Sequence, residues 1–336
     1  ARVLSISASA TANGRTTESG LTCDGTVTLS VIYVDPDGAL HGFDSSASFA
    51  NESPLSDLPA GAPVVVDAVV SDVRHNVTGG SVNVHIELSL RYTVSPESNA
   101  AALTAIEGAG TTELLKQPAV LWHTVRTDDE LTLTDEVRLP KEASDILSVT
   151  AFCRISSVTL LGGSAAISGV LCADVLYTCM DQSPAQAVFS LPFDASADLP
   201  EGVEAAYARC RVLSIEGTLT GEDTLELNAT AAFDTIALRR EEVELTADAY
   251  SSAEKLHCTA TPLQIRRDVW ADCRATARLE LPLPTGMPEA EQVHYVRLRP
   301  ASCTATPSSG SVALSATLHA SVLYSCAAGN LHSFET

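Results

Sequence analysis

Alternation of apolar and polar residues is the dominant pattern along the chain. It is clearest in Val82–Leu90, where every second residue is apolar, as in a strand with one buried face. A run rich in β-branched residues, Val64–Val77, precedes it, and Thr78-Gly79-Gly80 between the two is typical of a hairpin turn. Strong helical periodicity is scarce. The pattern therefore predicts a mainly β fold of antiparallel sheets, packed as sandwiches or partial barrels.

The same hairpin pattern returns later in the chain. Tyr207–Leu219 leads into the turn-like Thr220-Gly221-Glu222-Asp223, and Leu225-Glu226-Leu227-Asn228 then alternates with period two. Matching hairpins indicate matching topology, so we expect tandem copies of one β-unit.

A longer repeat encloses these hairpins. Val-Ile-Tyr ends at Tyr33 and Val-Leu-Tyr ends at Tyr177 and Tyr324, with spacings of 144 and 147 residues. Around each Tyr we expect the same order of a strand, a turn, a long apolar strand, a loop and a segment containing Phe. His41 and His332 follow the first and third copies, whereas the second has no His there.

The repeat divides the chain into five segments. We predict a first β-unit over residues 1–95, a connecting arm and strand pair over 96–143 and a second β-unit over 144–243. A second arm and strand pair over 244–290 and an incomplete third unit over 291–336 complete the division. Aligning the copies by their Tyr residues places both ends of the chain inside a unit, so we expect a fragment of a longer protein.

The two connecting arms differ in composition from the β-units. Pro96–Pro118 and Leu245–Pro262 contain Ala, Glu and Leu and share a Leu-Thr-Ala sequence, which suits either a short helix or an extended arm. Each leads into strand-like sequence, Leu131–Pro140 in one and Ala275–Pro282 in the other. Proline limits both, as it does at strand ends.

Two tryptophans recur with nearly the same period. Trp122 and Trp270 lie 148 residues apart, each before a strand-like run. We expect them to anchor the arms to their domains, because a large aromatic side chain brings much apolar area to a core. A carbohydrate platform or a hot spot for a partner is the alternative.

Composition and charge narrow the class of protein. The chain has 336 residues, 45% of them apolar, which is enough for about two packed domains. Its formal net charge of −22, from 42 acidic and 20 basic residues, argues against binding nucleic acid or anionic lipid through a basic surface. A solvated acidic surface is the first interpretation of this net charge, and binding of a cationic partner is the more specific alternative. No apolar run is long enough for a transmembrane segment.

Nine cysteines give an odd number with no C-x-x-C pair, which predicts neither a zinc site nor a closed disulfide framework. Most lie in strand-like runs, where a free Cys behaves as a small buried hydrophobe, so we expect a reducing compartment. Cys179 and Cys326 hold equivalent places two residues after the repeated Tyr, and cross-linking of subunits through them is the alternative.

Several elements of the second copy occur in an order that resembles a known family. They are Gly169–Tyr177, Leu191-Pro192-Phe193, Leu199-Pro200-Glu201-Gly202, a hairpin, and Asp248-Ala249-Tyr250-Ser251. This order resembles the SPOCS domain of endospore-forming bacteria.

The first copy departs from the SPOCS pattern in two places. Ala47-Ser48-Phe49 replaces Leu-Pro-Phe, and Ile106-Glu107-Gly108 replaces the Asp-Ala-Tyr element. The resemblance implies structural work in assembling the spore coat through protein contacts, often beside a LysM module, which this sequence does not contain. It places the protein in the spore coat or on the forespore surface, with an extracellular surface fibre as the alternative.

Residues suited to catalysis are sparse and scattered. None of the eight His lies in an H-E-x-x-H arrangement, and Asp35-Pro36-Asp37-Gly38 is a turn sequence before it is a calcium loop. The acidic pairs Asp128-Asp129 and Glu241-Glu242 suit solvated charge better than a glycosidase dyad. We therefore predict no catalytic, cofactor-binding or metal-binding residues, no cofactor and no enzymatic activity.

Two functions of different classes fit this pattern. The first is a structural protein that assembles with itself or with other coat or surface proteins through exposed sheet edges and exchanged arms. The second is an adhesive or glycan-binding surface module, in which the repeats provide avidity. The first predicts self-association, and the second predicts a monomer with a saturable ligand.

Overall fold

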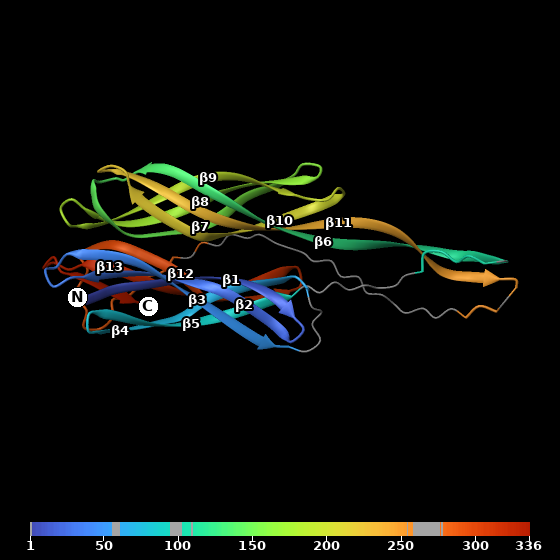
Figure 1. Ribbon diagram of the computed structural model, residues 1–336, viewed down its shortest axis with the longest axis horizontal. Helices are drawn as coiled ribbons and strands as arrows, with labels where there is room; N and C mark the ends of the chain where they lie inside the picture. Colours follow the sequence, from blue (N-terminus) through green and yellow to red (C-terminus); the bar gives the residue numbers. More distant parts are fainter. Residues whose placement is uncertain are drawn as a thin grey trace.

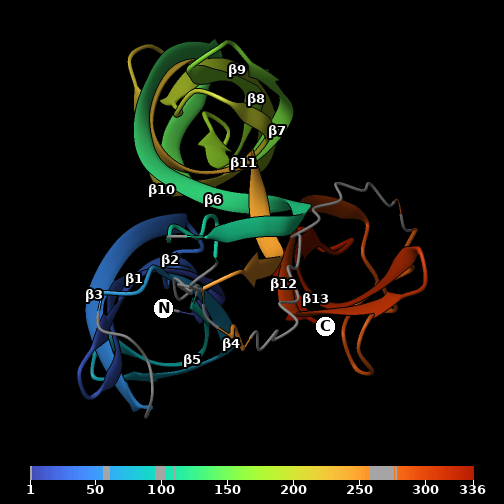
Figure 2. The same ribbon diagram turned by 90° about the vertical axis from the view of Figure 1, so that its right-hand side faces the viewer.

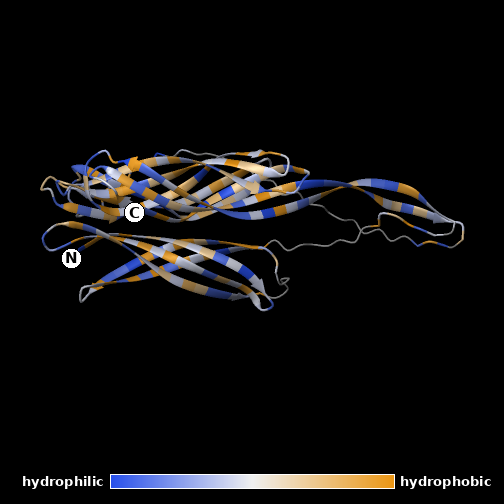
Figure 3. Ribbon diagram, turned by 45° about the horizontal axis from the view of Figure 1, so that its top comes forward, coloured by the Kyte–Doolittle hydropathy of each residue, from blue (hydrophilic) through white to orange (hydrophobic). Residues whose placement is uncertain are grey.

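The computed structural model describes residues 2–55, 61–94, 103–108, 110–253, 255–257, 276 and 278–336. Within these ranges the chain forms fourteen β-strands and no helix (Figure 1). Apolar and polar residues alternate along the strands (Figure 3), as predicted for strands with one buried face. The prediction of a mainly β fold with tandem antiparallel sheets is confirmed.

The first unit consists of a three-stranded meander and a hairpin. The meander has the order β1-β2-β3 and the hairpin pairs β4 with β5, all antiparallel. The predicted turn at Thr78-Gly79-Gly80 joins β4 to β5, and both glycines have positive φ. The bounds are β1 (Arg2–Thr17), β2 (Gly20–Val34), β3 (Leu40–Pro54), β4 (Val64–Thr78) and β5 (Ser81–Val94).

The second unit repeats this plan and adds a sixth strand. Its meander has the order β7-β8-β9, and its second sheet has the order β10-β11-β6. The added strand, β6, precedes the meander in sequence and pairs antiparallel with β11. The bounds are β6 (Thr111–Arg138), β7 (Ala143–Leu160), β8 (Ser164–Cys179), β9 (Pro184–Asp198), β10 (Val203–Leu219) and β11 (Thr224–Ser251).

The third unit is a single meander in the described part of the chain. It comprises β12 (Gln292–Ser308), β13 (Ser311–Ser325) and β14 (Leu331–Glu335), in that order and antiparallel. The repeated Tyr residues lie near the end of the middle strand in all three meanders, at Tyr33, Tyr177 and Tyr324.

The three units lie side by side around a common centre (Figure 2). Equivalent residues of the three middle strands, Ile32, Leu176 and Leu323, are all buried in one apolar cluster. The strand contacts are cyclic: β3 lies beside β7, β9 beside β12 and β14 beside β1. The repeats therefore form a closed ring with an approximate three-fold axis.

Polar contacts also join neighbouring units of this ring. The hydroxyls of Ser30 and Ser148 form a buried hydrogen bond of 3.0 Å between the first and second units. Arg2 donates to the carbonyl of Leu331 at 2.6 Å, which joins the first and third units. The buried serine pair adds little net stability by itself, but a hydroxyl left unpaired at this place would be costly.

The connecting arm of the second unit is extended. β6 and β11 pair along their whole lengths, and the N-terminal half of β6 with the C-terminal half of β11 projects beyond the barrel as a two-stranded ribbon (Figure 1). Of the two alternatives for the arms, a short helix or an extended chain, the described residues show the extended one.

The strand predicted at Ala275–Pro282 is absent from the described part of this segment. Thr276 and Arg278–Pro282 belong to no strand, so the prediction is wrong for these residues. A strand needs a neighbour to satisfy its backbone hydrogen bonds, and none of the described strands pairs with this segment.

The boundaries between the units and the connecting arms differ from those predicted from the sequence. Residues 123–138 of β6 belong to the sheet that closes the second unit, although they lie in the predicted arm segment 96–143. Similarly, β11 runs without interruption across the predicted division between residues 243 and 244.

Candidate assembly surfaces

The second unit encloses a complete core. β10 lies along β7 and β6 lies near β9, so the two three-stranded sheets surround a shared interior. Ile167, Leu171, Leu225 and Leu227 are all at most 1% exposed. The rings of Phe193 and Phe233 meet edge to face across this core, with centroids 5.2 Å apart.

A glycine in β8 makes room for one of these rings. A Cβ atom on Gly169 would collide with the ring of Phe193 and would lie 2.7 Å from the carbonyl oxygen of Arg154. The first unit repeats the arrangement, because a Cβ on Gly25 would lie 2.5 Å from the ring of Phe49. The Phe of the repeat therefore keeps its packing role in the first copy, although Ala47-Ser48 stands before it.

The first unit has the same plan but leaves one side of its core open. The inward residues of β5 are all only half-buried, namely Val82, Val84, Ile86 and Leu88. Matching the bulges of the two hairpins aligns them with Leu225, Leu227, Ala229 and Ala231 of β11, which are buried. This difference in burial arises because β6 pairs with β11 in the second unit, whereas within the described ranges no strand pairs with the second edge of β5.

The third unit exposes much of the inner face of its meander in the described chain, although Ala320, Val322 and Tyr324 at one end of β13 are buried. Val312, Leu314 and Leu318 of β13 are exposed, although their counterparts Ala165, Ile167 and Leu171 in β8 are buried completely. The strand β12 continues this apolar face. Its exposed members on the two strands are Val293, Val296, Leu298, Val312, Leu314 and Leu318. A contiguous apolar surface of this kind marks an interaction site in a native protein.

A group of polar contacts lies near the tip of the projecting β6–β11 ribbon. The carboxylate of Glu113 accepts hydrogen bonds from the Ile106 backbone N–H and the Thr246 hydroxyl, both at 3.0 Å, and pairs with Lys116 at 3.1 Å. The Lys116 hydrogen bond is the main cause that lowers the pKa of Glu113. Leu103 of the first arm accepts a backbone hydrogen bond from Thr246 at 2.8 Å. Both arms therefore meet at this ribbon.

A cavity of about 640 Å³ lies at the junction of the first and second units. Its wall carries both signs of charge, with Arg209 3.6 Å from Asp234 and the guanidinium of Arg211 3.4 Å from the carbonyl oxygen of Ala12. Asp128 and Cys210 also line it. The charges contact one another across the wall, so the cavity lacks the surplus of one sign that would select a charged ligand.

Two carboxyl groups in this wall form a pair that the sequence did not predict. Asp128 of β6 lies opposite Asp234 of β11, and their hydrogen bond is the main cause, with burial second, that raises the pKa of Asp128. Asp128 therefore pairs across strands, and the sequence neighbour Asp129 is not its partner.

The thiol of Cys210, which also lines this cavity, is poorly suited to nucleophilic chemistry. Cys210 interacts with the thiol of Cys153 across the two sheets, and this hydrogen bond, with burial second, raises the pKa of Cys210. A nucleophilic cysteine needs a lowered pKa. The seven described cysteines are all free, while Cys258 and Cys273 lie outside the described residues.

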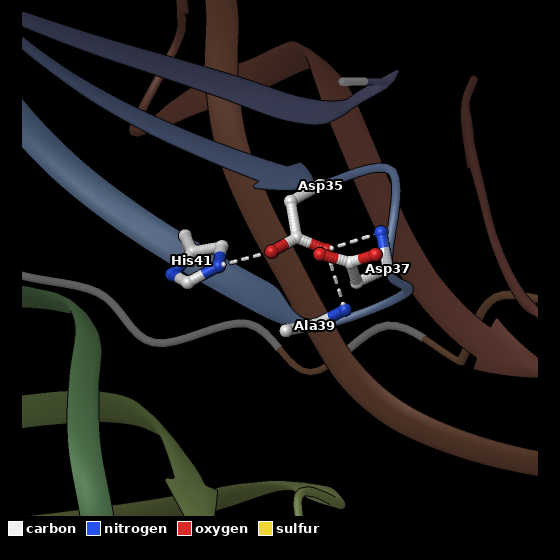
Figure 4. A network of polar contacts seen from close by, with 4 residues as sticks. All are labelled: Asp35, Asp37, Ala39 and His41. Carbon is white, nitrogen blue, oxygen red and sulfur yellow. Dashed lines mark hydrogen bonds and ion pairs between the residues drawn. The ribbon is translucent and has the colours of Figure 1, made fainter.

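The turn predicted at Asp35-Pro36-Asp37-Gly38 is confirmed and is closed by its first residue (Figure 4). One carboxylate oxygen of Asp35 accepts the backbone N–H of Asp37 at 3.0 Å and that of Ala39 at 2.8 Å, and the other lies 3.0 Å from His41 Nε2. The contact with His41 is the main cause that lowers the pKa of Asp35. All these partners are donors of the protein itself, so the carboxylate acts as a turn cap.

The His of this turn belongs to a small repeated stack. His41 stacks on Tyr33 with centroids 5.3 Å apart, and His332 stacks on Tyr324 at 5.6 Å. The second unit has Ala185 opposite Tyr177 instead. The recurrent His thus has a structural environment in both units where it occurs.

Other candidate groups remain separate. Among the residues that the structure describes, no three His, Cys, Asp or Glu side chains gather as they would around a metal ion. In the same residues there is no helix that is long and apolar enough to span a membrane. Trp122 is half-buried on β6, and Trp270 lies outside the described residues.

Comparison with known proteins adds no relative. No family model matches the chain, and neither a curated protein nor a solved structure matches it. The resemblance to the SPOCS family, read from the order of its sequence elements, stays a prediction.

The surfaces that differ between the units are the strongest candidates for function. The sequence predicted that the third unit is incomplete, but it did not predict the open side of the first. The sequence did contain a signal for the role of β6. Leu131 and Leu133 follow Trp122 in an alternating pattern and pack in the core of the second unit.

Proposed function

We propose that this chain is a non-catalytic structural protein that assembles with further copies of itself through its repeated β-units. One observation carries the proposal: the same inner-face positions are buried in the second unit and uncovered in the third, as with Ile167 and Leu314. An apolar face and an unpaired sheet edge favour association with other strands.

The arrangement of the open surfaces favours assemblies of many copies over closed two-fold dimers. The open edge at β5 and the uncovered face of β13 belong to different units and present different surfaces. Contacts between unlike surfaces are heterologous, and they produce rings or filaments rather than simple two-fold dimers. The projecting β6–β11 ribbon adds reach along the long axis of the molecule (Figure 1).

The cellular location of this assembly is proposed from the sequence resemblance. Spore coat or forespore surface is the proposed location, and other coat proteins are the proposed additional partners. A formal net charge of −22 keeps nucleic acid out of this proposal because the phosphate backbone would be repelled.

The proposal is tested by measuring the mass of the purified chain by light scattering across a concentration series, beside electron microscopy. We expect the mass to rise with concentration and ordered fibres or sheets to form. A strict monomer at every concentration, together with saturable binding on a glycan array, would instead identify a glycan-binding module and overturn the proposal.

A further inference from the structure

The open side of the first unit corresponds to the position that β6 occupies in the second unit. In the second unit, Leu131 and Leu133 of β6 lie opposite Ala231 and Ala229 of β11, and both leucines pack against the core. The matching positions on β5 are Leu88 and Ile86, aligned at the bulges of the two hairpins. The position that β6 would fill is therefore defined residue by residue.

A segment with the sequence pattern of β6 occurs elsewhere in the same chain. Leu279 and Leu281 follow Trp270 by nine and eleven residues, just as Leu131 and Leu133 follow Trp122. The two leucines of this later segment are 53% and 37% exposed, and Arg278–Leu283 belongs to no strand. The segment thus carries the apolar row of a strand without the sheet that would bury it.

We propose that Arg278–Leu283 of a second copy adds to β5 as an antiparallel strand, with Leu279 opposite Leu88 and Leu281 opposite Ile86. This inference rests on the proposed function and identifies its contact. It is β-augmentation, in which backbone hydrogen bonds supply affinity and alternate side chains supply register.

A second copy is the occupant because of where β5 lies. β5 packs on β4 and makes no comparable contact with a described strand of the other two units. Its label lies at the periphery of the ring in Figure 2, away from the common centre. β5 therefore lies on the outside of the ring, where another molecule can reach it.

The backbone of the segment suits this position. Its positions Arg278, Glu280 and Pro282 alternate with the leucines, so they would face solvent. Pro282 has no N–H to donate, which a strand tolerates when one of its edges stays unpaired. In the second unit β6 has this same situation, because β11 is its one partner among the described strands.

The register makes a specific electrostatic prediction. With Leu279 opposite Leu88, Glu280 lies opposite Glu87, and like charges directly opposite each other weaken a strand pair. We expect Glu280→Lys to tighten self-association about threefold, which is the middle of the range for such cross-strand pairs. Glu87→Lys alone should do the same, and the double variant should return to the wild-type affinity.

Two further variants test the apolar contact. Leu279→Asp with Leu281→Asp changes exposed side chains only, so the fold is kept, and we expect self-association to weaken at least tenfold. Leu161→Asp with Met180→Asp adds the same two charges to exposed turn residues of the second unit and should leave self-association unchanged. A peptide of residues 275–284 should compete with assembly, and the same peptide with both leucines changed to Asp should not.

The source of the strand is identified by photocrosslinking. p-Benzoylphenylalanine in place of Leu281 is mixed with ¹⁵N-labelled chain, and mass spectrometry locates the products. We expect mixed-isotope crosslinks within residues 84–90. Crosslinks within one copy, or to other strands, would overturn the inference. A rising mass that the Leu279→Asp, Leu281→Asp variant retains would overturn this contact but leave the proposed function standing, whereas a monomeric wild type would overturn both.

Discussion

Ile167 and Leu314 occupy the same place in two copies of one repeat, yet Ile167 is 1% exposed and Leu314 is 57% exposed. Both project from the middle strand of a meander toward the side where the second unit has its other sheet. The difference in burial thus measures what β10, β11 and β6 contribute to the second unit.

Substitution at these two positions should have opposite consequences. Ile167→Ala removes fully buried atoms and leaves a cavity, so we expect it to lower the free energy of unfolding by about 2–5 kcal/mol. Leu314→Ala should change the free energy of unfolding by less than about 0.5 kcal/mol, but it should weaken self-association. Chemical denaturation and light scattering of both variants check this, and equal losses of stability would contradict it.

The central cluster of the ring should couple the three units during unfolding. Ile32, Leu176 and Leu323 come from different units and are buried against one another. Leu176→Ala should cost about 2–5 kcal/mol and split one calorimetric transition into several, because the units lose their shared contact. Val188→Ala, on an exposed position of β9, is the control, and a single sharp transition in Leu176→Ala would show that the units unfold together for another reason.

The glycine beneath Phe193 should be sensitive to a single methyl group. Gly169→Ala places a Cβ against the Phe193 ring and the Arg154 carbonyl oxygen, and overpacking of this kind costs about 1–3 kcal/mol. Adding Phe193→Leu should restore part of the loss by removing ring atoms. The melting temperatures of the single and double variants check this, and a Gly169→Ala protein as stable as wild type would refute the packing role.

Sequence reasoning recovered the parts of the fold that depend on local chemistry. The alternation in Val82–Leu90 predicted β5, and the glycines at residues 79 and 80 predicted its turn, because both signals arise from neighbouring residues. The repeated Tyr predicted equivalent middle strands, and the structure places all three equivalently.

Features that depend on distant partners were not accessible in this way. Leu131–Arg138 and Ala275–Pro282 have similar strand-like sequences, yet among the described residues only the first forms a strand, since it has β11 beside it. The placement of Asp128 opposite Asp234 likewise requires the register of β6 on β11. Adjacent residues on a strand point to opposite faces, so the sequence neighbours Asp128 and Asp129 gave no indication of this contact with Asp234.

The carboxyl pair gives stability a pH dependence of defined sign. The hydrogen bond with Asp234 raises the pKa of Asp128 in the folded state above its ordinary value of 3.8. The folded protein therefore binds this proton more tightly than the unfolded chain does. The pair favours folding at low pH, and that contribution is lost as the pH rises through the raised pKa.

Asp128→Asn should remove this dependence and relieve the repulsion that remains at neutral pH. We expect the variant to be more stable than wild type at pH 7, by less than about 1 kcal/mol because Asp128 is exposed and solvent screens the pair. The difference should shrink as the pH falls below the raised pKa. Asp129→Asn removes the same charge from the neighbouring residue and serves as the control. Urea denaturation between pH 3 and pH 7 (roughly the range over which a carboxyl with a raised pKa titrates) checks the sign, and a variant that is less stable at pH 7 would show that the charged pair is stabilising.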